Sequence, residues 1–408
     1  MKQIESPNEN LIFIDDENYK VNQLDVTYII NRNDTCLAAL KMYLDVITEN
    51  SVVYKNKKKL LEKLNSFYGA KLTYSIKKAD TDYVVNFKIT TVLNKFVKGF
   101  RNIQLEAIRF IDTLIREGWG NNRAVFTSAL EKNITETQRL EQNEEFSLIH
   151  AVHNNFIPNL SYGIYPYGTV EEFKSLKDVD LSVARNALLK AQVLVTYIGD
   201  CNANALSLVN RVYKPSPFIA PLRSGDFHFS DEVKLVADST FDDTHIALVY
   251  ITEQIETLKV KLIEKIIVKL IANEIKKVNK IDYRVDANPK IDLLYKGNII
   301  VVRLNSDVNT AYEKIIQTVT EVINSISLSV REETFNHIVK SILFELEDVK
   351  TNPVKYSNFI IENKLCGLEY DLETQKNTLS SITLDDVKKK LNKLNYFGSL
   401  VLKGKKGE

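Results

Sequence analysis

Histidines are the side chains of this sequence whose spacing comes nearest to that of a metal site. Of the five, only His150 and His153 stand close together. A spacing of three places both imidazoles on one side of a helix, and Glu144 or Glu145 would be a third ligand about a turn or more away. Such a pair is also common at a surface or a helix end, so both interpretations stay open. No histidine stands in His-Glu-x-x-His or His-x-x-Glu-His, the arrangements that zinc peptidases use.

Other kinds of catalytic site have less support. No serine or cysteine is spaced from a histidine in a way that suggests a nucleophile and its base, and the 13 glycines include no loop that would cradle a phosphate. The three cysteines, Cys36, Cys201 and Cys366, are far apart and odd in number. We interpret them as reduced, buried small residues of a cytosolic protein, without a metal or redox role.

Charge and hydropathy narrow the partner classes and the location. The 54 lysines and arginines nearly balance the 53 aspartates and glutamates. The chain therefore has no large net charge that would attract nucleic acid or an anionic membrane, and we expect neither as a partner. Residues 1–10 are polar and carry both signs of charge, which predicts no secretory signal. No run of about 18 uncharged apolar residues occurs, so we expect no membrane span and a cytoplasmic protein.

The elements that would position a site occur twice along the chain. Apolar strands, amphipathic helices and a closing helix and strand recur in the same order about half a chain later. Four such pairs favour an internal duplication over chance matches in an α+β chain. The paired segments are 72–76 and 281–285, 83–89 and 300–304, 105–115 and 315–326, and 182–198 and 385–402.

A proline-rich segment separates the two copies. Three of the eight prolines fall within Tyr213–Pro221, and such a run is stiff and cannot continue a helix. We therefore predict an N-terminal lobe at 1–212, a linker at 213–223 and a C-terminal lobe at 224–408. Strands and helices mix without strict alternation. This favours an α+β fold, in which each homologous lobe has a mixed or antiparallel sheet with helices packed on one face.

Four segments, in this order along the chain, contain recognisable sequence motifs. Leu60–Ala70 is a leucine-rich helix that ends at tyrosine-glycine-alanine, and Phe126–Lys132 opens a helix with an acidic-basic pair. Ser161–Thr169 is a loop rich in tyrosine and glycine, and Leu176–Asp200 is a helix and strand that end at glycine-aspartate. Together they resemble the insulinase/pitrilysin family of metallopeptidases, especially its small bacterial branch, over nearly the whole chain.

Active members of that family hold zinc with an inverted His-x-x-Glu-His motif and a distal glutamate, and the motif glutamate activates the bound water. The order of elements places the motif in the helix Thr35–Thr48, near Lys41–Asp45, and the distal ligand near Gln138. Lys41 carries a positive charge and Leu44 offers no base. The resemblance therefore implies an inactive member that has lost the motif, with no catalytic residue, no metal and no cofactor.

The resemblance also points to the second lobe. In heterodimeric members, one subunit carries zinc, and the other closes the chamber and supplies an arginine and a tyrosine to the developing oxyanion. The matching positions are Lys276 and Tyr283. Lysine is a point charge without the bidentate fork of arginine, and Glu264–Ile275 lacks the glycine-rich turn of the family. The alternative is that Lys276 is a solvated helix residue and Tyr283 a packed strand aromatic.

The family binds extended substrate as an added strand at a sheet edge beside the zinc helix. The matching edge follows Gly69-Ala70 and consists of Lys71, Leu72, Thr73, Tyr74, Ser75 and Ile76. We hypothesise that this edge either still holds peptide or is capped by the partner.

One function and two alternatives follow from the resemblance. It implies a non-catalytic subunit of a heterodimeric zinc peptidase whose active partner bears His-x-x-Glu-His. The substrates would be peptides or precursor peptides, as in bacteriocin or leader-peptide processing. The alternatives are a structural scaffold subunit and a homodimeric peptide-binding protein without peptidase chemistry.

Overall fold

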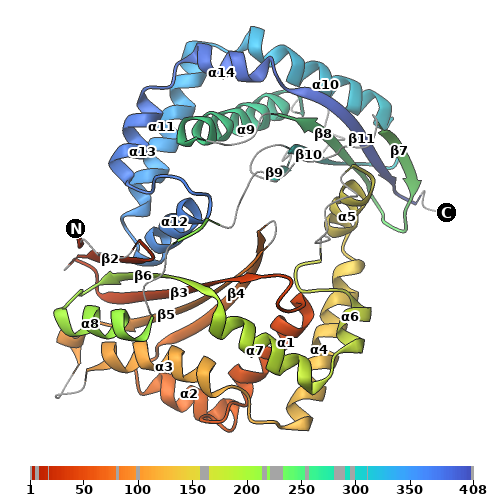
Figure 1. Cartoon of the computed structure of the whole chain (residues 1–408). Coiled ribbons are helices and arrows are strands. Elements are labelled where there is room, and N and C mark those ends of the chain that lie inside the picture. Colours follow the sequence, from red (N-terminus) through yellow and green to blue (C-terminus); the bar gives the residue numbers. More distant parts are fainter. Residues whose placement is uncertain are drawn as a thin grey trace. The chain divides into compact units, whose positions relative to one another are not determined.

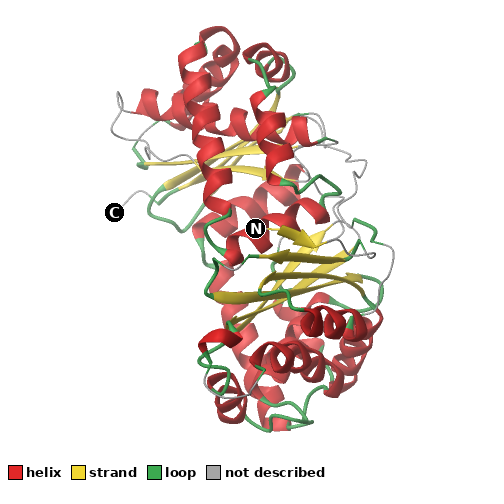
Figure 2. Ribbon diagram, turned by 90° about the vertical axis from the view of Figure 1, so that its left-hand side faces the viewer, coloured by secondary structure: helices red, strands yellow, loops and turns green. Residues whose placement is uncertain are grey.

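The structure is a computed structural model, and two compact units divide the chain between them. It describes residues 2–4, 9–16, 18–79, 82–97, 102–156, 165–213, 218–220, 233–252, 257–279, 290–294, 299–309 and 311–405. Two sheets and fourteen α-helices lie within these residues, and each unit contains one sheet (Figures 1 and 2). The predicted α+β fold with two sheets is confirmed.

The first unit is built on a mixed six-stranded sheet in the order β1-β2-β6-β3-β5-β4. The long strand β3 lies inside the sheet between β6 and β5, and β4 forms one edge (Figure 1). The pair of β2 and β6 is parallel, and the other pairs are antiparallel. The strands are β1 (Lys2–Ile4), β2 (Leu11–Asp15), β3 (Val21–Asn31), β4 (Lys71–Ala79), β5 (Asp82–Val92) and β6 (Gln192–Gly199).

One face of this sheet shares a hydrophobic core with seven helices. Val26 and Tyr28 on β3 alternate with polar residues, so that every second side chain enters this core. Helix α3 begins at the Asn102 cap and ends at Gly118, whose φ of 76° favours glycine. The helices are α1 (Leu37–Glu49), α2 (Lys57–Asn65), α3 (Ile103–Glu117), α4 (Arg123–Glu141), α6 (Val170–Ser175), α7 (Asp178–Lys190) and α8 (Ala203–Val212).

The opposite face of the first sheet is covered by a helix from much later in the chain. Helix α12 (Pro353–Leu365) packs on β3 and β6 and belongs to the first unit. The Ser357 hydroxyl donates to the buried carboxylate of Asp25 over 2.7 Å. The Lys88 ammonium lies 3.6 Å from the same carboxylate and also donates to the Asn358 side chain. Polar contacts therefore hold α12 on this face.

The second unit is built on a five-stranded sheet in the order β7-β11-β8-β10-β9. Helix α5 (Glu144–Phe156) packs on one face through Leu148, Val152 and Phe156. The strands are β7 (Val233–Asp238), β8 (Thr244–Ile251), β9 (Lys290–Leu294), β10 (Ile299–Ser306) and β11 (Asn395–Lys403). The other helices are α9 (Leu258–Asn279), α10 (Tyr312–Ser329), α11 (Glu332–Val349), α13 (Leu372–Ser380) and α14 (Leu384–Leu391).

The two units repeat one order of elements. In the first, β2, β3, β5 and β6 pair as β7, β8, β10 and β11 do in the second, including the single parallel pair. Residues 281–285 lie outside the described residues, so that part of the repeat stays a prediction. The lobe boundaries at 212 and 224 also stay a prediction. The first unit includes Asp348–Gly367, and the second includes Leu140–Ile164.

Part of the predicted linker contacts the first unit. Of residues 213–223, the structure describes 213 and 218–220. The side-chain amide of Gln192 donates to the Ile219 carbonyl over 3.0 Å and accepts from the Ile219 N–H over 3.1 Å. Tyr213 is buried. The parts of this segment that the structure describes, residue 213 and residues 218–220, are thus in contact with the first unit.

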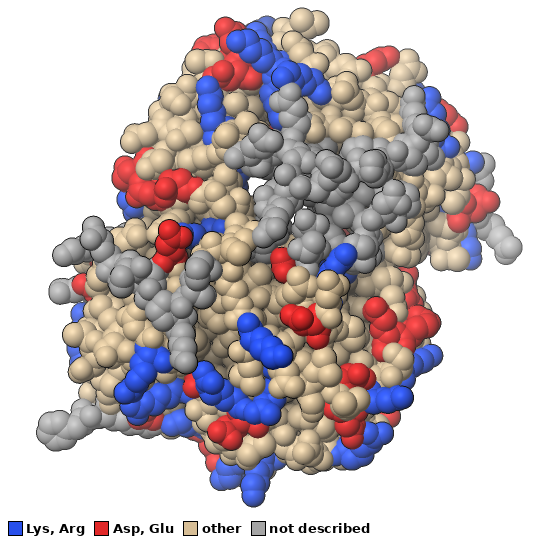
Figure 3. Space-filling model, viewed as in Figure 1, with Lys and Arg blue, Asp and Glu red and all other residues tan. Residues whose placement is uncertain are grey.

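Surface charge and free cysteines bear on the expected partners and location. Lysines and arginines are interspersed with acidic residues on the face shown in Figure 3, in keeping with the net charge of +1. No helix among the described residues is long and apolar enough to cross a membrane. None of the three cysteines forms a disulfide. The predicted burial holds for Cys201 but is wrong for Cys36, which is the exposed N-cap of α1, and Cys366 is only partly buried.

Candidate functional site

A polar cluster lies on α1, where the sequence places the zinc motif. Lys41 and Asp45 are four residues apart, so their side chains meet on one side of the helix. The Lys41 Nζ lies 2.6 Å from Asp45 Oδ2, and the two side chains are only 8 % and 12 % exposed. The neighbouring Tyr43 and Leu44 are fully buried in the core. The helix thus presents an ion pair from an otherwise apolar segment.

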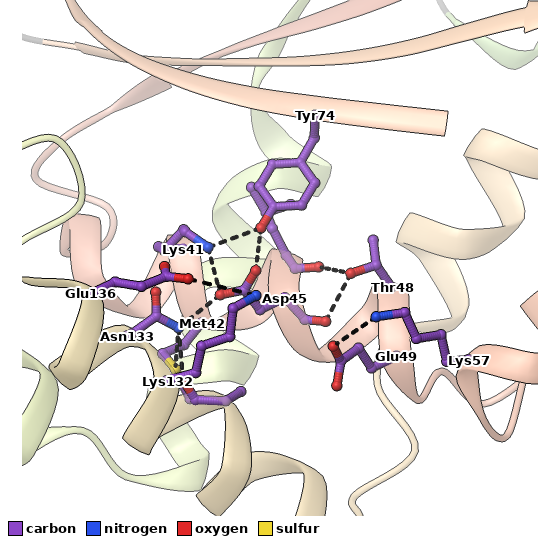
Figure 4. Close-up of polar contacts among 12 residues, drawn as sticks. Lys41, Met42, Asp45, Thr48, Glu49, Lys57, Tyr74, Lys132, Asn133 and Glu136 are labelled. Atoms are coloured by element: carbon purple, nitrogen blue, oxygen red, sulfur yellow. Dashed lines mark hydrogen bonds and ion pairs between the residues drawn. The ribbon is translucent and has the colours of Figure 1, made fainter. Parts of the chain in front are cut away.

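Two further elements donate to Asp45 (Figure 4). On α4, the Asn133 amide donates to Asp45 Oδ2 over 2.7 Å and to the Ala129 carbonyl over 2.8 Å. On the edge strand β4, the Tyr74 hydroxyl donates to Asp45 Oδ1. Burial, and then the nearby Asp45, raise the pKa of Tyr74, so this hydroxyl stays protonated. A single carboxylate therefore joins α1, α4 and β4.

Aromatic side chains surround the Lys41 ammonium. The Lys41 Nζ donates to the Tyr74 hydroxyl over 3.1 Å and lies 5.6 Å from the centre of that ring. It also lies 5.1 Å from the centre of the Tyr167 ring, which belongs to the tyrosine- and glycine-rich loop. A cation over such rings is attracted by their electron-rich faces. The positive charge is thus held by the Asp45 carboxylate, the Tyr74 hydroxyl and the ring of Tyr167.

This donor set does not fit zinc. A zinc peptidase needs three ligands of the imidazole or carboxylate type and a base beside the bound water. Here Asp45 is the carboxylate that contacts Lys41, whereas the nearby Glu136 pairs with Lys132 over 3.9 Å (Figure 4). Asn133 is a neutral amide, and Lys41 already provides a cation that would repel a metal. Leu44, at the position expected for the base, has no proton acceptor. The Lys41 ammonium is the counter-charge of the Asp45 carboxylate.

The helix α4 contributes a different residue from the one predicted. We expected the distal ligand near Gln138, but that side chain is exposed, and Asn133 is the α4 residue that contacts Asp45. Both Asn133 and Tyr167 were missed as members of the site. The signal that would have found Asn133 is its place among the apolar positions of α4, where a lone amide needs a partner.

The histidine pair does not form a metal cluster. No group of three or more histidine, cysteine, aspartate or glutamate side chains that could hold a metal ion occurs among the described residues. His150 stacks on Phe146 with ring centres 5.7 Å apart, and His153 is buried. The Glu144 carboxylate lies 3.1 Å from His245, and Glu145 pairs with Lys290. The two glutamates considered as third ligands are thus engaged with other side chains.

The predicted peptide-binding residues lie at the edge of the first sheet. Lys71, Leu72, Thr73, Tyr74, Ser75 and Ile76 all belong to β4, which pairs with β5 on one side. No strand among the described residues pairs with its other side. Leu72, Tyr74 and Ile76 pack toward the core, and the alternate residues face the side of α12. Tyr74 therefore connects this edge directly to the cluster on α1.

Of the two candidate residues in the second lobe, Lys276 and Tyr283, the structure describes only Lys276. Lys276 is exposed on α9, at a hollow of about 610 Å³ that is also lined by Lys277 and His337. Tyr283 lies outside the described residues. A joint role of the two residues stays a prediction.

Comparison with solved structures identifies the fold. A conserved protein from Enterococcus faecalis has a TM-score of 0.82 and 16 % identity, with 98 % of this chain and 97 % of that chain covered. An inactive peptidase M16 domain from Pseudomonas fluorescens has a TM-score of 0.78 and 10 % identity, with 100 % and 98 % covered. The chain has the fold of the M16 peptidases.

The likeness extends to a protein described as a protease. A protease from Helicobacter pylori has a TM-score of 0.75 and 10 % identity, with 98 % of this chain and 99 % of that chain covered. No protein-family model matches the sequence, and no relative was found among curated proteins. Both a protease and an inactive domain therefore share this M16 fold with the chain.

Proposed function

We propose that this chain is the non-catalytic subunit of a heterodimeric zinc peptidase of the insulinase type. It closes the chamber of an active partner that bears His-x-x-Glu-His and helps to bind peptide or precursor-peptide substrates in the cytoplasm. Bacteriocin or leader peptides are the substrate class that we expect. Lys276 and Tyr283 are the residues that we expect to support the transition state.

One observation carries this proposal. At the positions where the resemblance places the zinc motif, Lys41 pairs with Asp45 and Leu44 is buried and apolar, and Asn133 on α4 donates to Asp45. The same fold occurs in an inactive M16 domain from Pseudomonas fluorescens, at a TM-score of 0.78. A chain without a means to ionise water requires a partner if it is to take part in hydrolysis.

The edge strand supports a role in substrate binding. β4 keeps one side without a strand partner among the described residues, and the Tyr74 hydroxyl fixes its position against α1. An extended peptide that pairs with such an edge is held by main-chain hydrogen bonds, which do not need a metal. Loss of the zinc ligands is therefore compatible with continued peptide binding.

The decisive experiment compares the chain alone with the chain and its partner. Each subunit is purified separately from the native host or a recombinant source, its zinc content is measured, and hydrolysis of oxidised insulin B chain is assayed. We expect no zinc and no hydrolysis with this chain, and hydrolysis when it is mixed with a partner that carries the zinc motif. A motif Glu→Gln variant of the partner is the control and should abolish hydrolysis by the mixture.

A second readout tests the edge strand. Hydrogen exchange followed by mass spectrometry should show slower exchange in residues 71–76 when the insulin B chain or the partner is added, because one new strand protects alternate amides. Unchanged exchange in this segment under saturating peptide, with the partner also added, would remove β4 from the proposal. A partner whose activity is the same with and without this chain would remove the catalytic role of the pair.

A further inference from the structure

The first unit has a partly enclosed cavity of about 240 Å³ where the C-terminal parts of three helices meet. Residues of α3, α7 and α8 line it, together with residues of the strands β3 and β6. Most of the lining side chains are aliphatic: Ile115, Leu188, Leu189, Ala191, Val193 and Val212. The others are Tyr28, Asp112, Arg116 and Tyr213. An apolar cavity with a few polar side chains has the character of a ligand site.

Two tyrosines at this cavity have hydroxyl groups without a hydrogen-bond partner. The side chains of Tyr28 and Tyr213 are 5 % and 4 % exposed. The Tyr213 hydroxyl has no partner among the described residues, and none of those residues bonds to the Tyr28 hydroxyl. Burial raises the pKa of Tyr28, so its hydroxyl stays protonated and can both donate and accept a hydrogen bond. Buried polar groups are rarely left without a partner in folded proteins.

The charged side chains and helix ends make the interior of the cavity negative. The Arg116 Nε lies 2.6 Å from Asp112 Oδ1. The Asp112 side chain is 23 % exposed and that of Arg116 is 58 % exposed, so water screens the positive end of this pair more than the negative end. The last carbonyls of α3, α7 and α8 add partial negative charge. The lining therefore favours a positively charged group and disfavours an anion.

The size of the cavity limits the ligand to one ring and a short arm. A cavity of roughly 150 Å³ with apolar walls is large enough to bind benzene. The 240 Å³ found here leaves room for an arm of about two or three further atoms. Aliphatic walls suit the ring, whereas Tyr28 and Asp112 suit a polar end on the arm.

We propose that this cavity binds a small organic amine, with an aromatic ring and an ammonium group at the end of a short arm. The ammonium donates to the Tyr28 hydroxyl oxygen and to the Asp112 carboxylate. The Arg116 contact uses Oδ1 of Asp112, and the ammonium takes Oδ2. Hydrogen bonds between charged groups are stronger than those between neutral ones, so they select the amine over an alcohol of the same shape.

The test is a titration of the full chain with 2-(4-fluorophenyl)ethylamine, followed by fluorine NMR of the ligand. We expect saturable binding with a Kd of about 1 mM or tighter, the scale for a ligand of about ten non-hydrogen atoms. Two compounds keep the ring and change the charge. The neutral 2-(4-fluorophenyl)ethanol should bind at least about fivefold more weakly than the amine, and the anion 4-fluorophenylacetate at least about tenfold more weakly.

Variants of the lining separate the amine contacts from the fold. Asp112→Asn should weaken binding of the amine about tenfold and leave binding of the alcohol within about twofold, which a purely structural change would not do. Tyr28→Phe removes one oxygen and should weaken binding of the amine about threefold. Ala191→Phe places a ring in the cavity and should abolish binding of both compounds. The matched control is Asp178→Asn, because Asp178 also lies 2.6 Å from an arginine, Arg123, but does not line the cavity.

The control variant should bind the amine within about twofold of the wild type. The proposal is overturned if the amine does not bind saturably, if 4-fluorophenylacetate binds as tightly as the amine, or if Asp178→Asn weakens binding as much as Asp112→Asn. Should Asp112→Asn fail to fold, the comparison of Tyr28→Phe with Asp178→Asn decides the question in the same way. None of these measurements involves peptidase activity or the edge strand β4, so their outcome is independent of the proposed function.

Discussion

Replacement of Lys41 by methionine tests the structural role of the cluster on α1. Methionine keeps the length and much of the apolar stem of the lysine but removes the ammonium. The carboxylate of Asp45 then stays 12 % exposed without its counter-charge, although Tyr74 and Asn133 still donate to it. An ionised carboxylate in such a place is unfavourable unless it is paired.

The magnitude follows from the burial of the pair. Removal of one partner of a buried ion pair costs about 3–5 kcal/mol. Because two donors remain on Asp45, we expect the lower end, about 3 kcal/mol, of which the lost contact with the Tyr167 ring contributes about 0.5–1 kcal/mol. For a unit of roughly 200 residues this lowers the Tm by about 6–12 °C.

The assay is a comparison of thermal and denaturant unfolding of the full chain and four variants, of which Asp45→Leu alone is one. Lys41→Met should be strongly destabilised, whereas the double variant Lys41→Met with Asp45→Leu should recover much of the loss, since it leaves no buried charge. Thr48→Ala, on the same helix, is a control for changes in α1 itself. Two results would refute the reasoning. One is a Lys41→Met chain as stable as the wild type. The other is a double variant whose loss in free energy of unfolding exceeds the sum of the losses of Lys41→Met and Asp45→Leu alone.

Three further predictions concern other contacts. Burial raises the pKa of Glu264 from 4.5 to about 8, so at intermediate pH the folded chain keeps a proton that the unfolded chain has released. The free energy of unfolding should therefore fall as the pH rises from about 5 to 8, by up to about 1.4 kcal/mol per pH unit. In denaturant titrations, Glu264→Gln should flatten this pH dependence. Ser357→Ala should cost about 1–3 kcal/mol in the same assay, because the buried Asp25 loses a donor, and no loss would contradict the role of α12. A variant with ligands restored on the cluster positions should bind one zinc ion per chain by metal analysis, whereas absence of binding would show that the cluster does not occupy the metal position. That variant combines Lys41→His, Leu44→Glu, Asp45→His and Asn133→Glu.

Local patterns along the chain predicted many elements well. The predicted strand at 83–89 lies within β5, and the predicted helix at 105–115 lies within α3. These features depend on neighbouring residues, whose periodicity can be read directly. The internal strand β3 was not predicted, because it is buried on both faces and carries polar residues such as Asp25 where α12 covers it. Ser357 on α12, which donates to Asp25, lies more than 300 positions away along the chain.

The site could be predicted in part. Helix α1 was placed correctly, so Lys41 and Asp45 were located by the order of elements. On α4, Gln138 is exposed and Asn133 contacts Asp45, because five residues turn a helix by about 500° and the two side chains therefore point in different directions. The contact of Tyr167 with Lys41 joins a loop to a helix far along the chain, and no local pattern carries that information.

The most direct test of the account is the zinc content of the purified chain together with its peptidase activity. The chain is incubated with zinc and then dialysed against zinc-free buffer that contains no chelator. The account predicts less than about a tenth of a zinc ion per chain after this treatment, and no hydrolysis of insulin B chain. One tightly held zinc ion per chain, with hydrolysis that a chelator stops and zinc restores, would contradict it.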